Sequence, residues 1–306
     1  VISGERPLQM IRPSLWTRIA AVILCIFFGG SLLFNNVLYL SGLNDSIPLT
    51  ISHRGVDNGN GVQNTIPAMA ATIQEKPDYI EMDVQETKDH QFVVFHDENL
   101  KKLTGEDKTT HDLTLSQLQT IQAVENGHVA PIASFDDYLA FANKHQQKLL
   151  IEIKTTSADS KRMLDRFIKK YQQTILTHHH RIHSLDYEVV TGLKQKAPKL
   201  YVSYILPYNL VFPQTSANGY TMEETTLTGD FVQRAHQGKK HVYAWTVNNA
   251  DAMDRMVSLN VNGIVTDDLK TLQKQIRTYK DNPSYAKRID IYINRLPSLD
   301  ERISEK

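Results

Sequence analysis

Charged side chains occupy alternate positions in two strand-like runs of this sequence. Glu81 and Asp83 lie in "YIEMDV", and Glu152 and Lys154 lie in "LLIEIKTT". Because side chains two apart on a strand point to the same face, each pair is expected to share a face. Three carboxylates at two strand ends form a hard, oxygen-rich set that suits a divalent cation such as Mg²⁺ or Ca²⁺. For each acid taken alone, the alternative is a salt bridge at the strand end.

Histidines end two other strand-like runs, His53 in "LTISH" and His96 in "FVVFH". Imidazole titrates nearest to neutral pH, so two histidines beside an acidic metal site are candidates for a general base and a general acid. Arg54 and Lys154 add positive charge at the same strand ends, and arginine can bind an anion through two hydrogen bonds. This set fits a phosphate ester better than a sugar or a peptide. Without a metal, the same group would only bind phosphate.

The acidic run at residues 79–84 and the run at residues 92–96, which ends in His96, are expected to form a hairpin. The segment "QETKDHQ" between them is too short for a parallel crossover, so the runs must pair antiparallel. With Asp89 and His90 as a two-residue turn, residues whose numbers sum to 179 face each other. This register places His96 opposite Asp83.

Short β-rich runs alternate with helical patterns from residue 49 onward, which argues for a parallel sheet. Without the hairpin's return arm there are eight candidate parallel strands, the number that closes a (β/α)8 barrel with its active site at the carboxyl ends. We therefore predict an α/β fold, a TIM barrel over residues 48–279, with residues 97–133 as an insertion and 280–306 as a C-terminal extension. The alternative, an open doubly wound sheet, lacks a glycine-rich dinucleotide fingerprint. The nine β-rich runs lie at 49–53, 79–84, 92–96, 149–153, 181–185, 201–205, 217–221, 241–247 and 262–267.

Residues 19–40 carry no charge over 22 positions, and a bilayer core needs about 20 apolar helical residues. We predict a transmembrane helix here, preceded by a cytoplasmic segment at 1–18; a signal-peptide core and a buried helix are the alternatives. Arginines at positions 6, 12 and 18 precede the helix and "SGLNDSIPLTIS" after it has no Lys or Arg. The positive-inside rule then predicts location in the cell membrane with an extracytoplasmic catalytic domain.

Other features of composition bound the interpretation. Small residues at Gly29, Gly30 and Ser31 would let another helix approach, as in a multi-pass bundle, although a single helix fits equally. The sequence begins with Val1 rather than Met, which is compatible with a piece of a longer chain. The single cysteine, Cys25, excludes an intrachain disulfide. The net charge is zero, with 34 basic and 34 acidic residues, so no nucleic-acid partner is expected.

Taken together, the motifs resemble the glycerophosphodiester phosphodiesterase family. The matching blocks occur in order over roughly residues 49–270, and they include "HRG" with "QNTIPA", "IEMDVQETKDHQFVVFHDENLKKLTG", "LLIEIK", "YAWTVNNADAM" and "VNGIVTDD". The resemblance implies a TIM barrel of the phospholipase C type, dependence on a divalent metal, and hydrolysis of glycerophosphodiesters to an alcohol and glycerol phosphate. It also implies a membrane-anchored bacterial type, since some members carry this domain after a multi-pass membrane region.

The resemblance implies a role for each matching residue. His53 and His96 would be the catalytic pair, and Arg54 and Lys154 would contact phosphate. Trp245 would form a wall of the pocket, with barrel packing as its alternative role. At position 63 the family usually has Glu, and this chain has Gln63, which we keep as a metal ligand or a neighbour of the ligands. The metal ligands implied are Glu81, Asp83 and Glu152.

The substrates expected for such an enzyme are glycerophosphodiesters from deacylated lipids, lysophospholipids, or glycerol-phosphate polymers of the cell envelope such as teichoic acid. One alternative is a non-catalytic sensor or transport partner that binds glycerol phosphate. Another is a lysophospholipase D-like enzyme. The histidine-rich segment "THHHRIHS" at 177–184 lacks carboxylates at useful spacing, so it is not assigned to the site, and contact of this cluster with the site is the alternative. The nucleophile, water or a substrate hydroxyl, stays open.

Overall fold

The computed structural model describes residues 14–41, 47–208 and 211–281, and side chains within 34–41 are not among those described. The chain divides into two compact units, Val1–Asp45 and Ser46–Lys306. Most of the predicted segments 1–18 and 280–306 therefore lies outside the described residues.

The first unit contains one long helix, α1 (Leu15–Ser41). At about 1.5 Å per residue, its 27 residues are longer than the roughly 30 Å hydrocarbon core of a bilayer. Its span Leu15–Leu33 is apolar enough to cross a membrane, and none of it is buried within the protein. Large apolar side chains such as Ile26 and Phe27 are exposed along it. The helix is a candidate membrane span, and a signal sequence near an N-terminus has the same length and composition.

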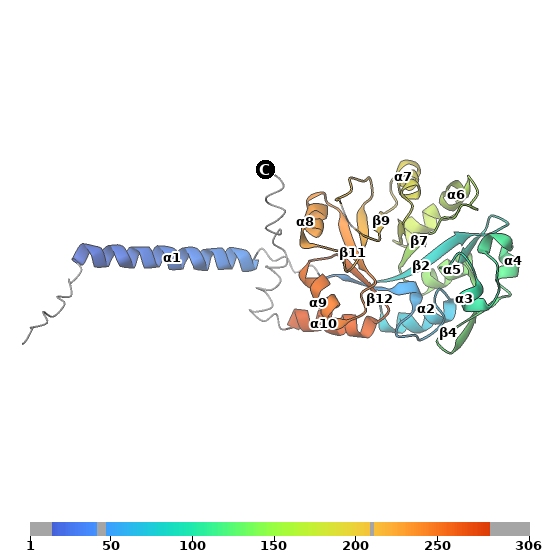
Figure 1. The fold of residues 1–306 in the computed structure, drawn as a ribbon, viewed down its shortest axis with the longest axis horizontal. Helices are drawn as coiled ribbons and strands as arrows, with labels where there is room; N and C mark the ends of the chain where they lie inside the picture. The colour runs from blue at the N-terminus through green and yellow to red at the C-terminus, as the bar shows by residue number, and fades with distance from the viewer. Residues whose placement is uncertain (1–13, 42–46, 209–210, 282–306) are drawn as a thin grey trace, which may run out of the picture. The chain divides into compact units, whose positions relative to one another are not determined.

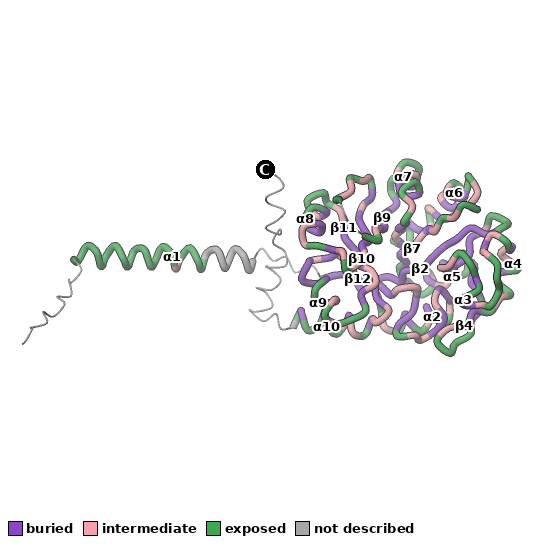
Figure 2. The backbone as a smooth tube through the Cα atoms, viewed as in Figure 1, coloured by how far each residue is buried: buried purple, intermediate pink, exposed green. Residues whose placement is uncertain are grey.

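The second unit is a closed barrel of eight parallel strands, as predicted (Figure 1). Each strand pairs in parallel with the next, and pairing of β1 with β2 closes the ring. The strands are short and rich in β-branched residues, with nearly every position buried (Figure 2), as expected for a parallel sheet covered by helices. In ring order they are β1 (Leu49–Ser52), β12 (Gly263–Thr266), β11 (His241–Trp245), β10 (Gly219–Glu223), β9 (Val202–Leu206), β8 (Arg181–Ser184), β7 (Leu149–Ile153) and β2 (Tyr79–Glu86).

Helices follow most strands, and their first turns are capped by the residue types that the sequence supplies. Thr65, Asp186 and Asn249 each accept a hydrogen bond from a backbone N–H of the helix that they precede. These caps fix where each helix leaves the carboxyl end of its strand. The larger helices of this unit are α2 (Ile66–Thr72), α5 (Phe135–Lys144), α6 (Met163–Thr177), α7 (Tyr187–Lys196), α8 (Gly229–Gln237), α9 (Ala250–Ser258) and α10 (Leu269–Asp281).

Aromatic side chains fill the barrel near the starts of its strands. The Arg181 guanidinium lies 5.0 Å from the ring centre of Tyr79, 4.5 Å from that of Tyr201 and 5.8 Å from that of Tyr243. Cation–π contacts of this kind stabilise a buried arginine without a carboxylate partner. The amino ends of the strands are thus plugged, and the opposite end of the barrel is the end that can bind a ligand.

The predicted hairpin forms, but its register differs by one residue from the prediction. β3 (Phe92–Val94) pairs antiparallel with β2, with Val84 opposite Val94, so paired residue numbers sum to 178 rather than 179. The reason lies in the turn. Thr87 N–H donates to the Gln91 carbonyl at 2.9 Å, which leaves a three-residue loop, and its last residue, His90, has φ of 58°.

As a consequence, the prediction that His96 lies opposite Asp83 is wrong. Phe95 lies opposite Asp83 and donates its N–H to the Asp83 carbonyl at 3.1 Å. His96 follows beyond the end of β3, where the chain has already left the ladder.

Residues 97–133, the predicted insertion, fold over a small core in which Leu100, Leu103 and Leu118 pack with Val93 and Phe95 from the hairpin's return arm. The insertion contacts the barrel through His111, whose Nε2 lies 2.8 Å from the Asp159 carboxylate. A last short strand pairs with β3 and returns the chain to the barrel. Its elements are α3 (Lys101–Thr104), η3 (Thr110–Asp112), α4 (Leu115–Leu118), the hairpin β4 (Gln122–Glu125) and β5 (His128–Pro131), and β6 (Ala133–Ser134).

Candidate active site

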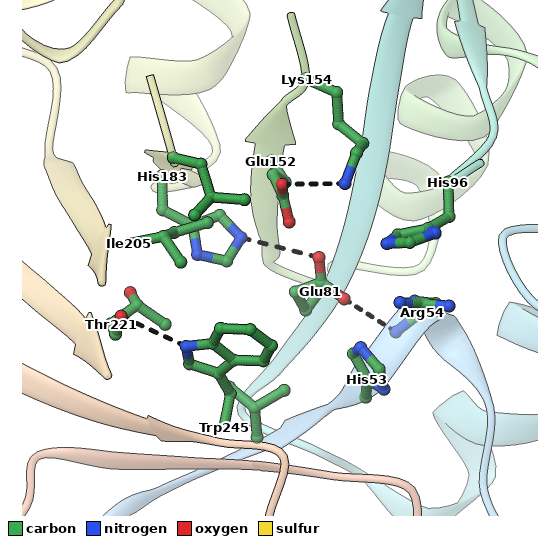
Figure 3. A pocket seen from close by; sticks show the side chains of 12 residues that line it. His53, Arg54, Glu81, His96, Glu152, Lys154, His183, Ile205, Thr221 and Trp245 are labelled. Carbon is green, nitrogen blue, oxygen red and sulfur yellow. Dashed lines mark hydrogen bonds and ion pairs between the residues drawn. The ribbon is translucent and has the colours of Figure 1, made fainter. Parts of the chain in front are cut away.

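A pocket of about 60 Å³ opens at the carboxyl ends of the barrel strands (Figure 3). Seven of the nine predicted site residues line it, namely His53, Arg54, Glu81, His96, Glu152, Lys154 and Trp245. The other two lie next to it: Asp83 is buried and contacts Arg54 and Lys154, and Gln63 lines an adjoining hollow. The other lining residues are His183, Leu185, Ile205, Thr221 and Val265.

His53 and Arg54 reach the pocket through the short turn η1 (His53–Gly55) that ends β1. Arg54 has φ of 51°, an uncommon backbone conformation for a residue other than glycine. Its N–H donates to Glu81 Oε2 at 2.9 Å, and its Nη1 donates to Gln63 Oε1 at 2.7 Å. These bonds hold the guanidinium between the two histidines in the view of Figure 3.

Each of the two histidines is oriented by a carboxylate. His53 Nδ1 lies 2.8 Å from Asp267 Oδ1, and His96 Nδ1 lies 2.6 Å from Asp97 Oδ1. A carboxylate at Nδ1 fixes the tautomer and leaves Nε2 as the nitrogen available to a substrate.

The surroundings shift the two imidazoles in opposite directions. Burial opposes the charge of His53, but its hydrogen bond to Asp267 and the charge of Glu81 outweigh that effect and raise its pKa. Burial lowers the pKa of His96, and the charges of Lys154 and Arg54 add to this effect against the attraction of Asp83. Near neutral pH His96 is therefore the more readily neutral of the two, as a general base must be, and His53 the more readily protonated, as a general acid must be.

Glu81, Glu152 and His183 present ligand atoms that lie within 4.8 Å of one another. His183 Nε2 is 3.6 Å from Glu81 Oε1, too far for a hydrogen bond, and both of its buried ring nitrogens lack a hydrogen-bond partner among the described residues. A buried imidazole without a partner is costly, and a cation held with two carboxylates would satisfy it. The donor set therefore fits a divalent metal.

The electrostatics of the two glutamates support the same conclusion. Burial favours the neutral form of Glu81, but the adjacent His183 and His53 and the Arg54 N–H prevail and lower its pKa to about 2. For Glu152, burial and the charge of Asp83 raise the pKa to about 7. Glu152 is thus still partly protonated near neutral pH, and a bound cation would displace that proton.

Asp83 lies behind the cluster, almost fully buried. Its Oδ2 accepts a hydrogen bond from Asn64 Nδ2 at 2.8 Å, and its Oδ1 lies 3.7 Å from Lys154 Nζ without a hydrogen bond of its own. Lys154 also donates to Glu152 at 3.2 Å. Asp83, in β2, thereby contacts Arg54 at the end of β1 and Lys154 at the end of β7. Its role as a metal ligand stays a prediction.

Gln63 is fixed at both ends of its amide. Its oxygen accepts the Arg54 bond, while its Nε2 donates to Glu125 Oε1 at 2.6 Å and its backbone N–H donates to Glu125 Oε2 at 2.9 Å. The carboxylate that is missing from position 63 is thus supplied next to it by the inserted hairpin. Its role as a metal ligand also stays a prediction.

Trp245 forms one wall of the pocket, at the end of β11. Its Nε1 donates to the Thr221 carbonyl at 3.3 Å, which orients the indole along the opening. Together with Ile205 it makes this side apolar, while the side formed by Arg54 and Lys154 is charged (Figure 3).

Sequence reasoning missed His183, Asp267 and Glu125. His183 pairs in register with Glu152, so recognising that β7 and β8 are neighbours would have identified it. Asp267 directly follows β12, the strand that pairs with β1, which is the same kind of signal. Glu125 gave no signal, because it lies in an irregular insertion whose docking cannot be read from periodicity.

Comparisons with known proteins point to one family. The model of the glycerophosphoryl diester phosphodiesterase family matches residues 53–271. A glycerophosphodiester phosphodiesterase of Caldanaerobacter subterraneus subsp. tengcongensis is 27% identical over 75% of this chain and 98% of that enzyme. The human protein named lysophospholipase D GDPD1 is 43% identical over only 22% of this chain and 21% of its own.

Solved structures show the same fold. An Oleispira antarctica phosphodiesterase, solved in complex with the product sn-glycerol-3-phosphate, superposes with a TM-score of 0.66 at 18% identity over 76% of this chain and 97% of that one. A protein from Galdieria sulphuraria described as a putative glycerophosphodiester phosphodiesterase gives 0.67 at 22% identity over 76% and 98%. With the family match covering most of the barrel, the chain belongs to the glycerophosphoryl diester phosphodiesterase family and is an enzyme of that family.

Proposed function

We propose that the enzyme hydrolyses glycerophosphodiesters to an alcohol and glycerol phosphate with His53 and His96 as its acid–base pair. The observation that carries this proposal is the placement of two carboxylate-oriented histidines and Arg54 in one pocket. Each histidine offers Nε2 to the pocket, and Arg54 lies between them in Figure 3. A phosphodiester bound to Arg54 would have a proton acceptor and a proton donor within reach.

The opposite pKa shifts favour His96 as the base and His53 as the acid. His96 removes the proton from the attacking oxygen, which belongs to water or to a neighbouring glycerol hydroxyl. His53 delivers a proton to the leaving alcohol as the P–O bond breaks. If the glycerol hydroxyl attacks first, the resulting cyclic phosphate is opened by water with the two roles reversed.

The metal centre that we propose uses Glu81, Glu152 and His183, with Asp83 and Gln63 as further candidates. A divalent cation such as Mg²⁺ or Ca²⁺ supplies Lewis acidity that neutralises charge on the phosphoryl oxygens. Arg54 and Lys154 bind the same phosphate by direct hydrogen bonds and place it against the histidines. Trp245 excludes water from the other side of the pocket.

We also propose that α1 holds the enzyme in the cell membrane with the barrel outside the cytoplasm, where envelope glycerophosphodiesters would be its substrates. The apolar exposed surface of α1 supports anchoring. Hydrolysis of lysophospholipids is a second candidate activity, supported by the apolar wall at Trp245 and by the local similarity to the human lysophospholipase D.

The test uses the full chain in detergent, with glycerophosphocholine, glycerophosphoglycerol and lysophosphatidylcholine as substrates and phosphorus NMR to identify products. We expect glycerol phosphate from the first two, activity that EDTA removes and Mg²⁺ or Ca²⁺ restores, and losses of about 10²–10⁴-fold for His53→Ala and His96→Ala. Release of lysophosphatidic acid would establish the second activity. Metal binding without turnover of any substrate would instead support the non-catalytic sensor.

A further inference from the structure

A second hollow adjoins the catalytic pocket on the side of the insertion. Its cavity volume is about 350 Å³, against about 60 Å³ for the catalytic pocket, and the two share His53 and Arg54 in their linings. Its remaining lining includes Gln63, Glu125 and Lys102. Whatever occupies the larger hollow therefore lies next to the group that binds at Arg54.

The wall of this hollow is held against the barrel by close contacts. Asn126, at the tip of the β4–β5 hairpin, donates to the Gly61 carbonyl at 3.3 Å. A Cβ atom at Gly59 would lie 3.3 Å from the Asn126 side chain, and Gly59 has φ of +70°. Two hydrogen bonds from Gln63 to Glu125, the residue before Asn126, hold the same tip of the hairpin. These contacts fix the hairpin side of the hollow against the barrel.

The ionised groups around the hollow have hydrogen-bond or ion-pair partners, with one exception among the described residues. Glu125 accepts both Gln63 bonds, and Asp267 accepts from His53 and from Asn248. Lys102 has no hydrogen bond and no ion pair there, although its charge acts on nearby Asp97. An unpaired cation on a polar wall is suited to an anionic group of a ligand.

We propose that this hollow binds a second phosphodiester of the substrate, one glycerol unit away from the phosphodiester that is cleaved, with Lys102 as its cationic contact. The inference rests on the proposed function, because the scissile phosphate at Arg54 defines which part of the substrate enters the hollow. Substrates of this class carry two phosphodiesters, as in bis(glycerophospho)glycerol and in chains of glycerol phosphate.

The chain offers a matched control for Lys102. Lys101 precedes it on α3, carries the same charge and is exposed, but its Nζ is paired with Asp107 at 2.9 Å and it does not line the hollow. Lys101→Ala therefore changes net charge to the same extent without touching the hollow. Lys102→Arg keeps the charge at the hollow.

The experiment measures kcat/KM of the full chain for bis(glycerophospho)glycerol and for glycerophosphoglycerol, and follows their ratio. The ratio cancels effects of Lys102 on the histidines through Asp97, since these act on both substrates. We expect Lys102→Ala to lower the ratio by about 5- to 10-fold through KM, as for loss of one charge-assisted hydrogen bond. We expect Lys101→Ala and Lys102→Arg to leave it within about twofold, and added salt to reduce it in the wild type.

An unchanged ratio in Lys102→Ala, or an equal fall in Lys101→Ala, would overturn the proposal. Failure of the wild type to hydrolyse either substrate would instead refute the proposed function, and calorimetric binding of bis(glycerophospho)glycerol to wild type and Lys102→Ala would still test the hollow. Chains of glycerol phosphate, used as a third substrate, distinguish a polymer from a deacylated lipid as the source of the second phosphate. A higher kcat/KM for the chains than for bis(glycerophospho)glycerol would identify the polymer as the source.

Discussion

His53 and His96 line the same pocket, but their surroundings shift their pKa values in opposite directions. Both donate Nδ1–H to a carboxylate, yet burial and two neighbouring cations hold the pKa of His96 below 6.5, while Asp267 and Glu81 hold that of His53 above it. A base must be neutral and an acid protonated before they act. With His96 as the base and His53 as the acid, as proposed above, activity is expected between the two pKa values.

The pH profile tests this assignment. Because the base His96 is lost as it is protonated, kcat/KM should fall on the acid side through the pKa of His96; because the acid His53 is lost as it is deprotonated, kcat/KM should fall on the alkaline side through the pKa of His53. Asp267→Asn removes the charge that raises the pKa of His53, so the alkaline limb should move to lower pH. Movement of the acid limb in Asp267→Asn would assign the roles the other way round.

Glu152 provides a second test at the level of one side chain. Its folded pKa of about 7 lies above the ordinary 4.5, so the folded state holds an extra proton between these values and is destabilised as pH rises through them. Glu152→Gln should therefore raise the unfolding free energy of the metal-free protein by up to about 3 kcal/mol at pH 8, and its melting temperature should rise accordingly. At pH 4.5 both quantities should be nearly unchanged.

Calorimetry at the two pH values, in EDTA, measures this difference. The same substitution should weaken binding of Mg²⁺ or Ca²⁺, and wild-type binding should release a proton below pH 7 but not well above it. The matched variant Glu188→Gln, in the first turn of α7, controls for loss of an exposed carboxylate. A Glu152→Gln protein that is less stable than wild type at pH 8 would contradict the raised pKa.

The elements that position these residues were readable from the sequence to different degrees. The barrel strands were predicted because buried parallel strands are short apolar runs, as in β7, where the predicted and observed ranges agree at 149–153. The register of the hairpin was not predicted correctly, because the choice between a two-residue and a three-residue turn depends on His90 adopting a positive φ. The place of His183 follows only from the pairing of β7 with β8, which sets His183 opposite Glu152, and no local pattern encodes that pairing.

The contact between the inserted hairpin and the loop that holds Gln63 is not encoded by any local sequence pattern. β4 carries Glu125 to Gln63, and Gln63 in turn accepts from Arg54, so the hairpin determines where the guanidinium points. Glu125→Ala should lower kcat/KM on glycerophosphoglycerol by about tenfold, chiefly in kcat, because Arg54 loses its fixed partner. Its melting temperature should change little, since Glu125 is not in a core.

The exchange of the two side chains gives a stricter test of that element. In Gln63→Glu/Glu125→Gln the carboxylate moves to the position next to Arg54, and the amide at 125 can still accept from the backbone N–H of residue 63. We expect this double variant to recover most of the activity that Glu125→Ala loses, while Gln63→Glu alone places two carboxylates together and weakens both bonds. Kinetics of the wild type, Gln63→Glu, Glu125→Gln and the double variant form a double-mutant cycle, and purely additive effects would show that no such contact acts in catalysis.

At the scale of the whole molecule, the two units have different physical requirements. The barrel buries an apolar core of its own, which includes Met82, Phe167 and Tyr220. The helix α1 has no buried surface in its span Leu15–Leu33. Exposed apolar side chains along such a helix are typical of a segment that lies in lipid or against another protein, and the proposed anchoring rests on them. This division was visible in composition alone, because an uncharged run of 22 residues needs no knowledge of contacts.

Removal of the first unit should separate attachment from catalysis. A chain that begins at Ser46 keeps every residue of the pocket, so we expect it to fold without detergent and to hydrolyse glycerophosphoglycerol with kcat/KM within about twofold of the full chain. The full chain should float with lipid vesicles in a density gradient, and the shortened chain should remain with soluble protein. The variant Leu24→Lys/Phe28→Lys, which places charges inside the apolar span, should also fail to float while keeping its kcat/KM. Flotation of the shortened chain would place the membrane contact on the barrel itself, and loss of its activity in solution would show that the barrel needs the first unit to fold.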